Sequence, residues 1–268
     1  MTARQRLKYW LFTAVPGFAG RYPYHGALVH FPRKAVVIQA LCKNGLFEPE
    51  VVARLVRLAR PNSTVFDVGA NLGLMSIPVL RAHSTTRVVS FEPSPNSLPF
   101  LQRTAAGSQY VDRWTIVGKA LADRSGERDF EFGRADDALY DGFHGGARVR
   151  DARTVRVPVS RLDEEWRALG SPNVSVVKID VEGAEALVLA GASELLKAWK
   201  PAVVLEWHHD YLELFETPPE TLLAIAREFG YRVYTIPSGV PIDDERTLQV
   251  QMMACSNFLL LARDLDPA

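Results

Sequence analysis

The chain has 268 residues, of which 47% are hydrophobic and 23% are charged. This usage is close to that of ordinary globular domains and excludes a chain that is mostly disordered. Lysine plus arginine and aspartate plus glutamate both total 31, so the formal net charge is zero, which gives no support to a nucleic-acid-binding protein, since such proteins normally carry a basic surface.

The first segment of the chain is basic and then apolar. Arg4, Arg6 and Lys8 precede an apolar run over 9–18 that is broken at Pro16. This run is too short to cross a bilayer as a helix. We predict that residues 1–47 form a helical or extended segment that packs on the core. Contact with a membrane surface is the second interpretation and a cleaved secretory signal the third. We expect the protein to be cytoplasmic.

From about Glu48 the sequence alternates between strand and helix character. Short apolar, β-branched runs predict strands at 64–68, 87–91, 114–117, 174–179, 202–206, 232–236 and 258–262. Apolar residues at helical spacing predict helices at 50–58, 74–82, 96–105, 184–189 and 221–229. Strands separated by helices indicate a mostly parallel sheet that is covered on both faces.

Residues 120–172 interrupt this alternation. Two pieces with strand character, 128–132 and 154–159, flank a polar, glycine-rich loop at 141–146, and a short helix is expected over 162–169. We interpret this region as an inserted β-hairpin with loops. Loops of this kind often fold over substrates.

A nucleotide site is predicted where the first strand of this alternation ends. The segment 65–73 runs from a strand through Gly69 into a helix, so free backbone N–H groups lie beside the carboxyl ends of the strands. Glycine allows the tight turn and the close approach of a ligand. Asp67 could accept from a ligand ammonium group. Glu92 closes the second strand, where an acidic side chain can hold the two hydroxyls of a ribose.

Other nucleotide motifs fit the sequence less well. The dinucleotide pattern G-x-G-x-x-G, aligned on Gly69, requires glycine where the chain has Asn71 and Leu74. The phosphate-loop pattern and the G-x-S-x-G nucleophile elbow are also missing from the sequence. A nicotinamide-dependent oxidoreductase therefore remains a less favoured alternative.

Several segments carry a family resemblance. The segment 65–73 resembles motif I of class I methyltransferases, and its D-V-G-A-N-x-G form is similar to that of the FkbM family. Segments 45–50, 91–93 and 178–185 resemble the same family in the same order, and the match covers roughly 45–261. The resemblance implies a Rossmann-like α/β fold whose seven-stranded sheet has one antiparallel strand near the C-terminus. It also implies S-adenosyl-L-methionine as the donor and O-methyl transfer as the reaction.

The resemblance also implies which positions meet the cofactor. Glu92 would hold the ribose hydroxyls, Asp123 would accept from the adenine amino group, and Glu48 would approach from the preceding helix. The full set implied to bind the cofactor is Glu48, Asp67, Gly69, Asn71, Gly73, Glu92, Asp123 and Asp180.

The reaction itself points to a further kind of residue. Methyl transfer from a sulfonium needs the reactants held in line, which is worth about 7–11 kcal/mol of the barrier. A hydroxyl acceptor must also lose a proton, for which a general base adds about 10²–10⁴-fold. The candidates for this base are Asp180, Glu182 and His208, with His144 on the glycine-rich loop as a fourth. For the two carboxylates, capping of the helix that follows is the structural alternative.

Metal and disulfide sites are not predicted. His208 and His209 are adjacent, not spaced by one helical turn, so no metal centre is expected. Cys42 and Cys255 are far apart in sequence and are expected to be reduced. The sequence thus favours an O-methyltransferase that acts on a hydroxyl of a sugar, a glycan or a secondary metabolite. A non-catalytic module that keeps the fold and the cofactor is the main alternative from another class.

Overall fold

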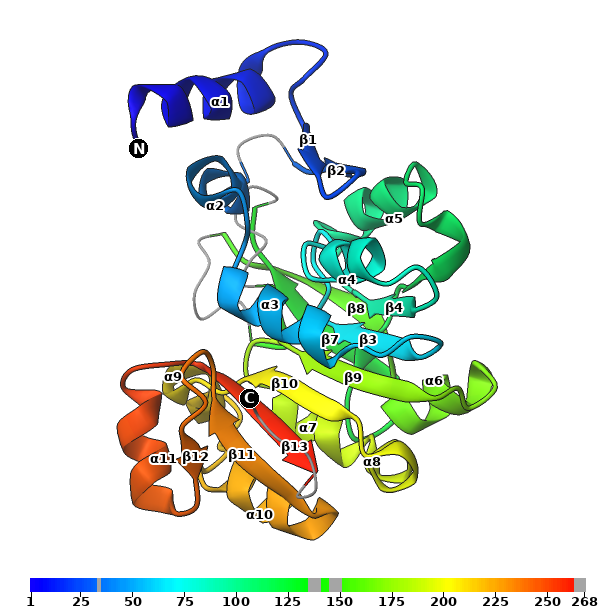
Figure 1. Cartoon of the computed structure of the whole chain (residues 1–268), viewed down its shortest axis with the longest axis vertical. Coiled ribbons are helices and arrows are strands. Elements are labelled where there is room, and N and C mark those ends of the chain that lie inside the picture. Colours follow the sequence, from blue (N-terminus) through cyan, green and yellow to red (C-terminus); the bar gives the residue numbers. More distant parts are fainter. Residues whose placement is uncertain (33–34, 135–140, 145–150, 263–268) are drawn as a thin grey trace.

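The computed structural model describes residues 1–32, 35–134, 141–144 and 151–262. Its main sheet has the strand order β12-β11-β13-β10-β9-β3-β4-β5 (Figure 1). The strands are β3 (Thr64–Val68), β4 (Arg87–Phe91), β5 (Trp114–Val117), β9 (Val174–Ile179), β10 (Ala202–Glu206), β11 (Tyr231–Thr235), β12 (Pro241–Ile242) and β13 (Asn257–Ala262). The five strands from β10 to β5 pair in parallel, and β13 is antiparallel to both its neighbours. The predicted seven-stranded sheet is confirmed, with the two-residue β12 added at one edge.

The central strands are buried on both faces. Every residue of β3 and of β9 is buried, as expected for parallel strands with helices on each side. Neighbouring residues face opposite ways, so Val65 joins one apolar cluster and Phe66 joins the other. The two clusters form the two halves of the core.

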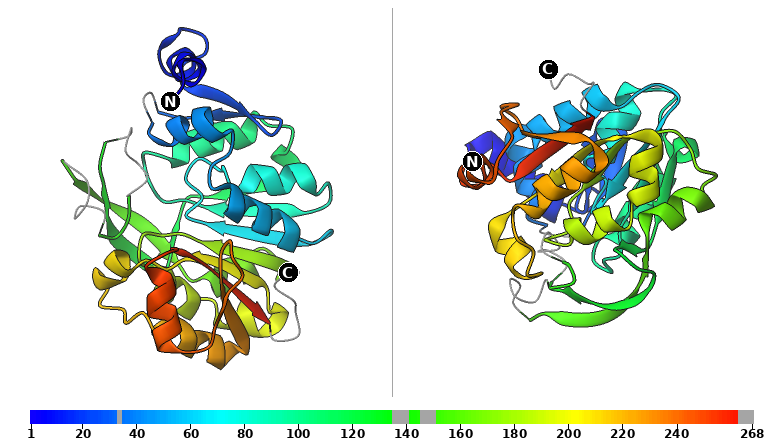
Figure 2. Two further views of the ribbon diagram at one scale, coloured as in Figure 1. Left: turned by 60° about the vertical axis from the view of Figure 1, so that its left-hand side comes forward. Right: turned by 90° about the horizontal axis from the view of Figure 1, so that it is seen from below.

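Helices cover both faces of the sheet (Figures 1 and 2). One cluster contains buried residues of α2 (Val37–Asn44), α3 (Pro49–Leu58), α4 (Ser76–Ala82) and α5 (Leu98–Ala106). The other contains residues of α6 (Leu162–Ala168), α7 (Glu185–Ala190), α8 (Ser193–Trp199), α9 (His209–Glu213), α10 (Thr221–Phe229) and α11 (Glu245–Met252). A short 3₁₀ helix, η1 (Val111–Arg113), precedes β5. In the part of the chain that the structure describes, no helix has the length and apolar character needed to cross a membrane.

The inserted region forms a second sheet of order β6-β8-β7. Its strands are β6 (Ala120–Leu121), β7 (Gly126–Phe132) and β8 (Arg153–Ser160), and the antiparallel β7–β8 pair is the predicted hairpin. The predicted loop at 141–146 is described only as far as His144. Asp141 fixes this part of the loop to the main domain by accepting from Ser94 Oγ at 2.6 Å and from Asn96 Nδ2 at 3.0 Å.

The N-terminal residues form α1 (Ala3–Ala14) and a hairpin of β1 (Arg21–Tyr24) and β2 (Ala27–His30). The hairpin is anchored by buried hydroxyls, since Tyr22 donates to the Leu41 carbonyl at 3.2 Å and Tyr24 to the Leu74 carbonyl at 3.1 Å. Helix α1 lies at the outer end of the molecule, beside α2 (Figure 1). The division of the chain into residues 1–47 and 48–268 stays a prediction. Cys42 and Cys255 are both free thiols.

Candidate active site

A cavity of about 200 Å³ lies at the carboxyl ends of β3, β4, β9 and β10. Its wall includes the turn after β3, the residues that follow β9, and the end of β10. Residues from two other regions complete it: Val37 and Phe47 from the N-terminal side, and Phe130 and Phe143 from the insert. Ligands of open α/β sheets bind at this edge, because strand ends and helix N-termini meet there.

The turn after β3 packs tightly against the end of β9. Gly69 has a φ of +74°, and a Cβ at this position would collide with the Asp180 carbonyl oxygen. Only glycine fits both this backbone and this contact. Two residues further on, the Asn71 backbone N–H donates to Glu92 Oε2 at 2.7 Å. The turn is therefore held by the neighbouring strands on both sides.

Glu92 is the buried carboxyl group at the end of β4. Its Oε1 accepts from the Ser94 backbone N–H at 2.7 Å, while its Oε2 accepts from Asn71. Burial raises the pKa of Glu92 to about 7, although these two N–H groups act in the opposite direction. Each oxygen keeps a further lone pair with which it can accept from a ligand hydroxyl.

Lys178 connects the turn to the end of β9. This buried ammonium lies 3.2 Å from Asp180 Oδ2 and 3.5 Å from Asp67 Oδ1, and it donates to the Gly69 carbonyl at 3.0 Å. Burial by itself lowers the pKa of Lys178, but the carboxylates of Asp180 and Asp67 outweigh it and raise the pKa. Asp67 also accepts from Ser76 Oγ at 2.6 Å. Lys178 thus neutralises its carboxylate neighbours.

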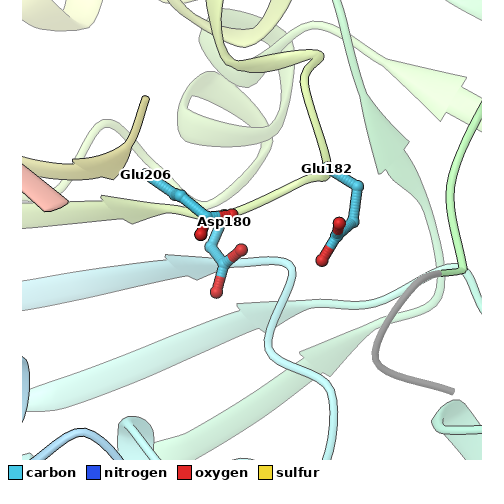
Figure 3. Close-up of side chains that lie close together, drawn as sticks. All are labelled: Asp180, Glu182 and Glu206. Atoms are coloured by element: carbon cyan, nitrogen blue, oxygen red, sulfur yellow. The ribbon is translucent and has the colours of Figure 1, made fainter. Parts of the chain in front are cut away.

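Three carboxyl groups gather in the cavity wall at the carboxyl ends of β9 and β10. Asp180, Glu182 and Glu206 each place an oxygen within 4.8 Å of the others (Figure 3). Burial raises the pKa of Glu206 well above its ordinary value, and the charges of Asp180 and Glu182 raise it further. Burial, with Asp180 next, also raises the pKa of Glu48 to about 7. Within this carboxyl cluster of Asp180, Glu182 and Glu206, Glu206 therefore favours its protonated form at neutral pH.

Besides Gly69, three described residues of the cavity wall have left-handed backbone conformations. They are Glu48 with a φ of 41°, Asn71 with 49° and Glu182 with 57°. Such conformations are uncommon for residues other than glycine and persist only where the surroundings impose them. Their concentration around one cavity supports a functional role for it.

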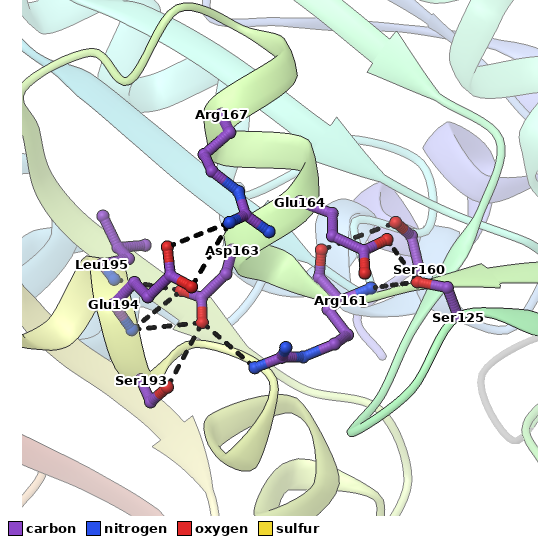
Figure 4. Close-up of polar contacts among 9 residues, drawn as sticks. All are labelled: Ser125, Ser160, Arg161, Asp163, Glu164, Arg167, Ser193, Glu194 and Leu195. Atoms are coloured by element: carbon purple, nitrogen blue, oxygen red, sulfur yellow. Dashed lines mark hydrogen bonds and ion pairs between the residues drawn. The ribbon is translucent and has the colours of Figure 1, made fainter.

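A buried carboxylate outside the cavity serves a different purpose. Asp163 of α6 accepts from the backbone N–H groups of Glu194 at 3.1 Å and Leu195 at 3.0 Å (Figure 4). It also accepts from Ser193 Oγ and pairs with Arg161 at 3.3 Å. The carboxylate therefore caps the N-terminus of α8 from another helix.

Most of the residues predicted to form the site lie together in the structure. The cavity is lined by Glu48, Gly69, Asn71, Glu92, Asp180 and Glu182. Their individual roles stay predictions, but one wall brings them together from four separate segments of the chain.

The other predicted residues are placed outside this lining. Asp67 is covered by Lys178 and Ser76, and a Cβ on Gly73 would meet the Trp114 ring at 2.6 Å. Asp123 pairs with Arg124 at 3.4 Å. The His208 ring lies 4.6 Å from that of Tyr211, and the His144 ring lies 4.7 Å from that of Phe215.

Several residues that line the cavity, above all Glu206, have no role in the prediction from sequence. Glu206 ends a buried strand next to β9, and an acidic residue at such a strand end was the available signal. Val37 and Phe130 carried no comparable signal, because each reaches the wall from an element outside the alternating pattern.

The charges of the wall fit S-adenosylmethionine, which carries a sulfonium and an ammonium against one carboxylate. Among the described lining residues, two are lysines and six carry carboxyl groups: Glu48, Glu92, Asp141, Asp180, Glu182 and Glu206. Glu92 has the acceptors that ribose hydroxyls need. The carboxyl cluster also offers oxygen ligands of the kind that divalent cations take, and the expectation of no metal stays a prediction.

Comparison with known proteins agrees with this geometry. The methyltransferase FkbM domain family matches residues 67–233. The 2-O-methyltransferase NoeI of Sinorhizobium fredii is 25% identical over 84% of this chain and 96% of its own length. The 31-O-demethyl-FK506 methyltransferase FkbM of Streptomyces tacrolimicus is 29% identical over 50% of this chain and 61% of its own.

Two further similarities concern proteins of different length. The antimetabolite synthetase AmbE of Pseudomonas aeruginosa is 28% identical, and the match covers 70% of this chain but 10% of AmbE. The crystal structure of an FkbM methyltransferase from Methylobacillus flagellatus is 14% identical, with a TM-score of 0.46 over 82% of this chain and 60% of that one.

The family match spans more than half of the chain and contains both the turn after β3 and the carboxyl ends of β4, β9 and β10. It decides between the nucleotide-dependent activities that the sequence left open, and it removes the oxidoreductase alternative. The chain belongs to the FkbM methyltransferase family and is an S-adenosylmethionine-dependent methyltransferase.

Proposed function

We propose that the protein methylates a hydroxyl oxygen of a sugar, a glycan or a hydroxylated secondary metabolite. The observation that carries the proposal is the carboxyl cluster of Asp180, Glu182 and Glu206 in the cavity wall. A hydroxyl must lose its proton as its oxygen is alkylated, and carboxylates are suitable acceptors for both that proton and neighbouring hydroxyl groups. Two relatives whose names describe O-methyl transfer, NoeI and FkbM, support the same reaction.

The two sides of the cavity have separate tasks in this proposal. S-adenosylmethionine supplies the methyl group as an electrophilic carbon. When the cofactor is bound, Glu92 would accept from the ribose hydroxyls, and the turn from Gly69 to Asn71 would hold the methionine part. The aromatic rings of Phe143 and Tyr211 line the acceptor side. Trp207 belongs instead to the core, because it is fully buried and its indole N–H donates to the Pro219 carbonyl at 3.0 Å.

Glu206 is the proposed proton acceptor. The Asp180 carboxylate is already paired with Lys178 at 3.2 Å, so one of its oxygens is engaged within the protein. The pKa of Glu206 lies far above its ordinary value because the group is buried beside Asp180 and Glu182. A cation bound beside Glu206 lowers the pKa of this carboxyl group towards neutrality, where a general base is most effective.

The reaction is tested with the purified protein, methyl-labelled S-adenosylmethionine, and panels of saccharides, hydroxylated metabolites and amines. We expect label in a hydroxylated product, with NMR placing the methyl group on oxygen. Methylation of nitrogen or carbon would contradict the proposal. Cofactor binding with no product from any panel would support the non-catalytic module instead.

The proton acceptor is tested by Glu206→Gln, which we expect to lower kcat by about 10²–10⁴-fold while the Kd for S-adenosylmethionine changes little. His208→Ala is the comparison variant, because Tyr211 lines the cavity and His208, whose ring lies 4.6 Å from that of Tyr211, does not. An equal loss in both variants would contradict the assignment. Activity that EDTA abolishes and Mg²⁺ restores would assign the cluster to a metal ion instead.

A further inference from the structure

Helix α1 has two different faces. On the inner face, Phe12 packs on Tyr22 with ring centroids 4.8 Å apart, Lys8 lies over the same ring, and Gln5 donates to the Lys43 carbonyl at 3.0 Å. These contacts fix the orientation of α1 on the hairpin and on α2. The helix start is also fixed, because Thr2 and Gln5 form a reciprocal capping box.

The outer face carries an apolar stripe. Its members are Ala3, Leu7, Trp10 and Ala14, which are spaced by four, three and four residues and therefore share one side of the helix. Leu7 is 64% exposed and Trp10 is 57% exposed. Phe18, just after the helix, is 51% exposed. Because the inner face is already anchored, this stripe points away from the protein.

Basic residues border the stripe. At 3.6 residues per turn, Arg4 lies on one side of it and Arg6 on the other, and both are exposed. The sequence of residues 1–47 contains seven lysines and arginines and no aspartate or glutamate. Since the whole chain has equal numbers of both charges, residues 48–268 carry an excess of seven acidic side chains. The positive charge is thus concentrated in the N-terminal part of the sequence, and three of these basic residues, Arg4, Arg6 and Lys8, belong to α1.

The apolar stripe and its basic border together indicate which partner covers this face of α1: a second copy of the helix or a lipid surface. A second copy of α1 would add three more basic side chains and no acidic residue that could neutralise Arg4 and Arg6. An anionic lipid surface offers both an apolar layer for Leu7 and Trp10 and phosphates for the arginines. A helix of 12 residues is about 18 Å long, so it lies in the interface and does not span the bilayer.

We propose that α1 docks the protein on anionic lipid bilayers. Leu7, Trp10 and Phe18 enter the boundary between headgroups and acyl chains, and Arg4 and Arg6 contact the phosphates. Helix α2 contacts α1 and contributes Val37 to the cavity wall. Docking therefore brings the cavity within one helix of the lipid surface. This inference goes beyond methyl transfer and does not depend on the identity of the acceptor.

The test is co-sedimentation of the full chain with two kinds of vesicle, phosphatidylcholine alone and an equimolar mixture of phosphatidylcholine and phosphatidylglycerol. We expect binding to the mixed vesicles only, and weaker binding at high salt. Leu7→Ser with Trp10→Ser should weaken binding to the mixed vesicles by at least about tenfold. Tenfold corresponds to about 1.4 kcal/mol, and apolar burial of either side chain contributes more than this. Arg4→Gln with Arg6→Gln should remove the preference for anionic lipid.

Trp199→Ser is the matched control. Trp199 is also exposed, at 40%, but it lies at the end of α8, so its loss should leave vesicle binding unchanged. Cofactor affinity verifies that each variant is folded. The proposal is overturned if the unaltered protein binds neither vesicle or if the Leu7 and Trp10 double variant binds as well as the original. It is also overturned if light scattering shows a dimer that this variant dissociates.

Discussion

Two carboxylate sites in this protein have opposite environments: Asp163 is fully buried, while Asp180, Glu182 and Glu206 are half-buried. At the junction of α6 and α8, Asp163 accepts from two backbone N–H groups and a hydroxyl and pairs with Arg161. In the cavity, Asp180, Glu182 and Glu206 crowd together, and burial and mutual repulsion raise the pKa of Glu206. The first arrangement stabilises the fold, while the second costs stability that a cationic ligand can offset.

The largest expected effect is at the α6–α8 junction. Asp163→Ala leaves the N-terminus of α8 uncapped and Arg161 without its partner, so we expect a loss of about 3 kcal/mol in the free energy of unfolding. Chemical denaturation measures it. Glu194→Ala is the control, since Glu194 pairs with Arg167 on the surface and should cost less than about 1 kcal/mol. Equal losses of stability in the two variants would contradict the structural role assigned to Asp163.

Glu92 is expected to control cofactor affinity. Glu92→Ala removes the acceptors for the ribose hydroxyls and should weaken S-adenosylmethionine binding by about 2–3 kcal/mol, measured by calorimetry. An unchanged Kd would refute this role. Thermal unfolding of the ligand-free variant reports separately on the lost bonds to Asn71 and Ser94.

Glu206→Gln should make the ligand-free protein more stable. Glutamine at this position removes the cost of keeping a carboxyl group protonated beside Asp180 and Glu182. We expect a gain of about 1–2 kcal/mol in the free energy of unfolding at pH 8, together with the loss of activity described above. A loss of stability in this variant would show that Glu206 stabilises the fold, as Asp163 does.

Stability is expected to fall as the pH rises. Burial raises the pKa of Glu92 and of Glu185 to about 7 in the folded state. The unfolded chain releases these protons near pH 4.5, so their stabilising contribution is complete below that pH and is lost as the pH rises through about 7. Between pH 6 and pH 8 the free energy of unfolding should fall by about 1 kcal/mol for each of these two groups.

Glu185→Gln isolates one part of this pH dependence. The Val181 and Gly183 backbone N–H groups both donate to Oε1 of Glu185, and a glutamine oxygen can accept both bonds without titrating. Denaturation curves at pH 6 and pH 8 should therefore differ by about 1 kcal/mol less in this variant. An identical pH dependence in both proteins would show that Glu185 is ionised throughout.

The smallest effect is expected at Asp123. If it accepts from the adenine amino group, Asp123→Asn should weaken cofactor binding by about 1 kcal/mol, the net contribution of one hydrogen bond. Calorimetry with the spent cofactor, S-adenosylhomocysteine, should show the same loss because adenine is common to both. No loss with either compound would limit Asp123 to its pair with Arg124.

The parts of the fold that the sequence predicted are those with local signals. The ranges of β3, β4, β9 and β10 were predicted to the residue, because continuous apolar runs mark buried parallel strands. Helix α8 was missed, since its cap comes from Asp163 on another helix. The β1–β2 hairpin was also missed, because tyrosine contacts far along the sequence, such as Tyr24 to Leu74, hold it in place.

In the candidate site, too, the residues with local sequence signals were predicted and those that depend on tertiary contacts were not. Glu48, Gly69, Asn71, Glu92, Asp180 and Glu182 were identified from motifs, and all of them line the cavity. The role proposed for Glu206 required the structure, because its pKa depends on burial and on Asp180 and Glu182, which follow the neighbouring strand β9. Charge crowding is a tertiary property that no single segment of sequence displays.

The strand order has a consequence for recombination between relatives. The segment 67–233 that matches the family ends before β13, which lies between β10 and β11 in the sheet. Val37 and Phe47, from upstream of that segment, close one side of the cavity. In a chimera that exchanges only the aligned segment, the carboxyl ends of β4, β9 and β10 would come from one relative. The strand β13 and the cavity residues Val37 and Phe47 would come from the other. Successful exchanges should therefore carry both flanks with the segment.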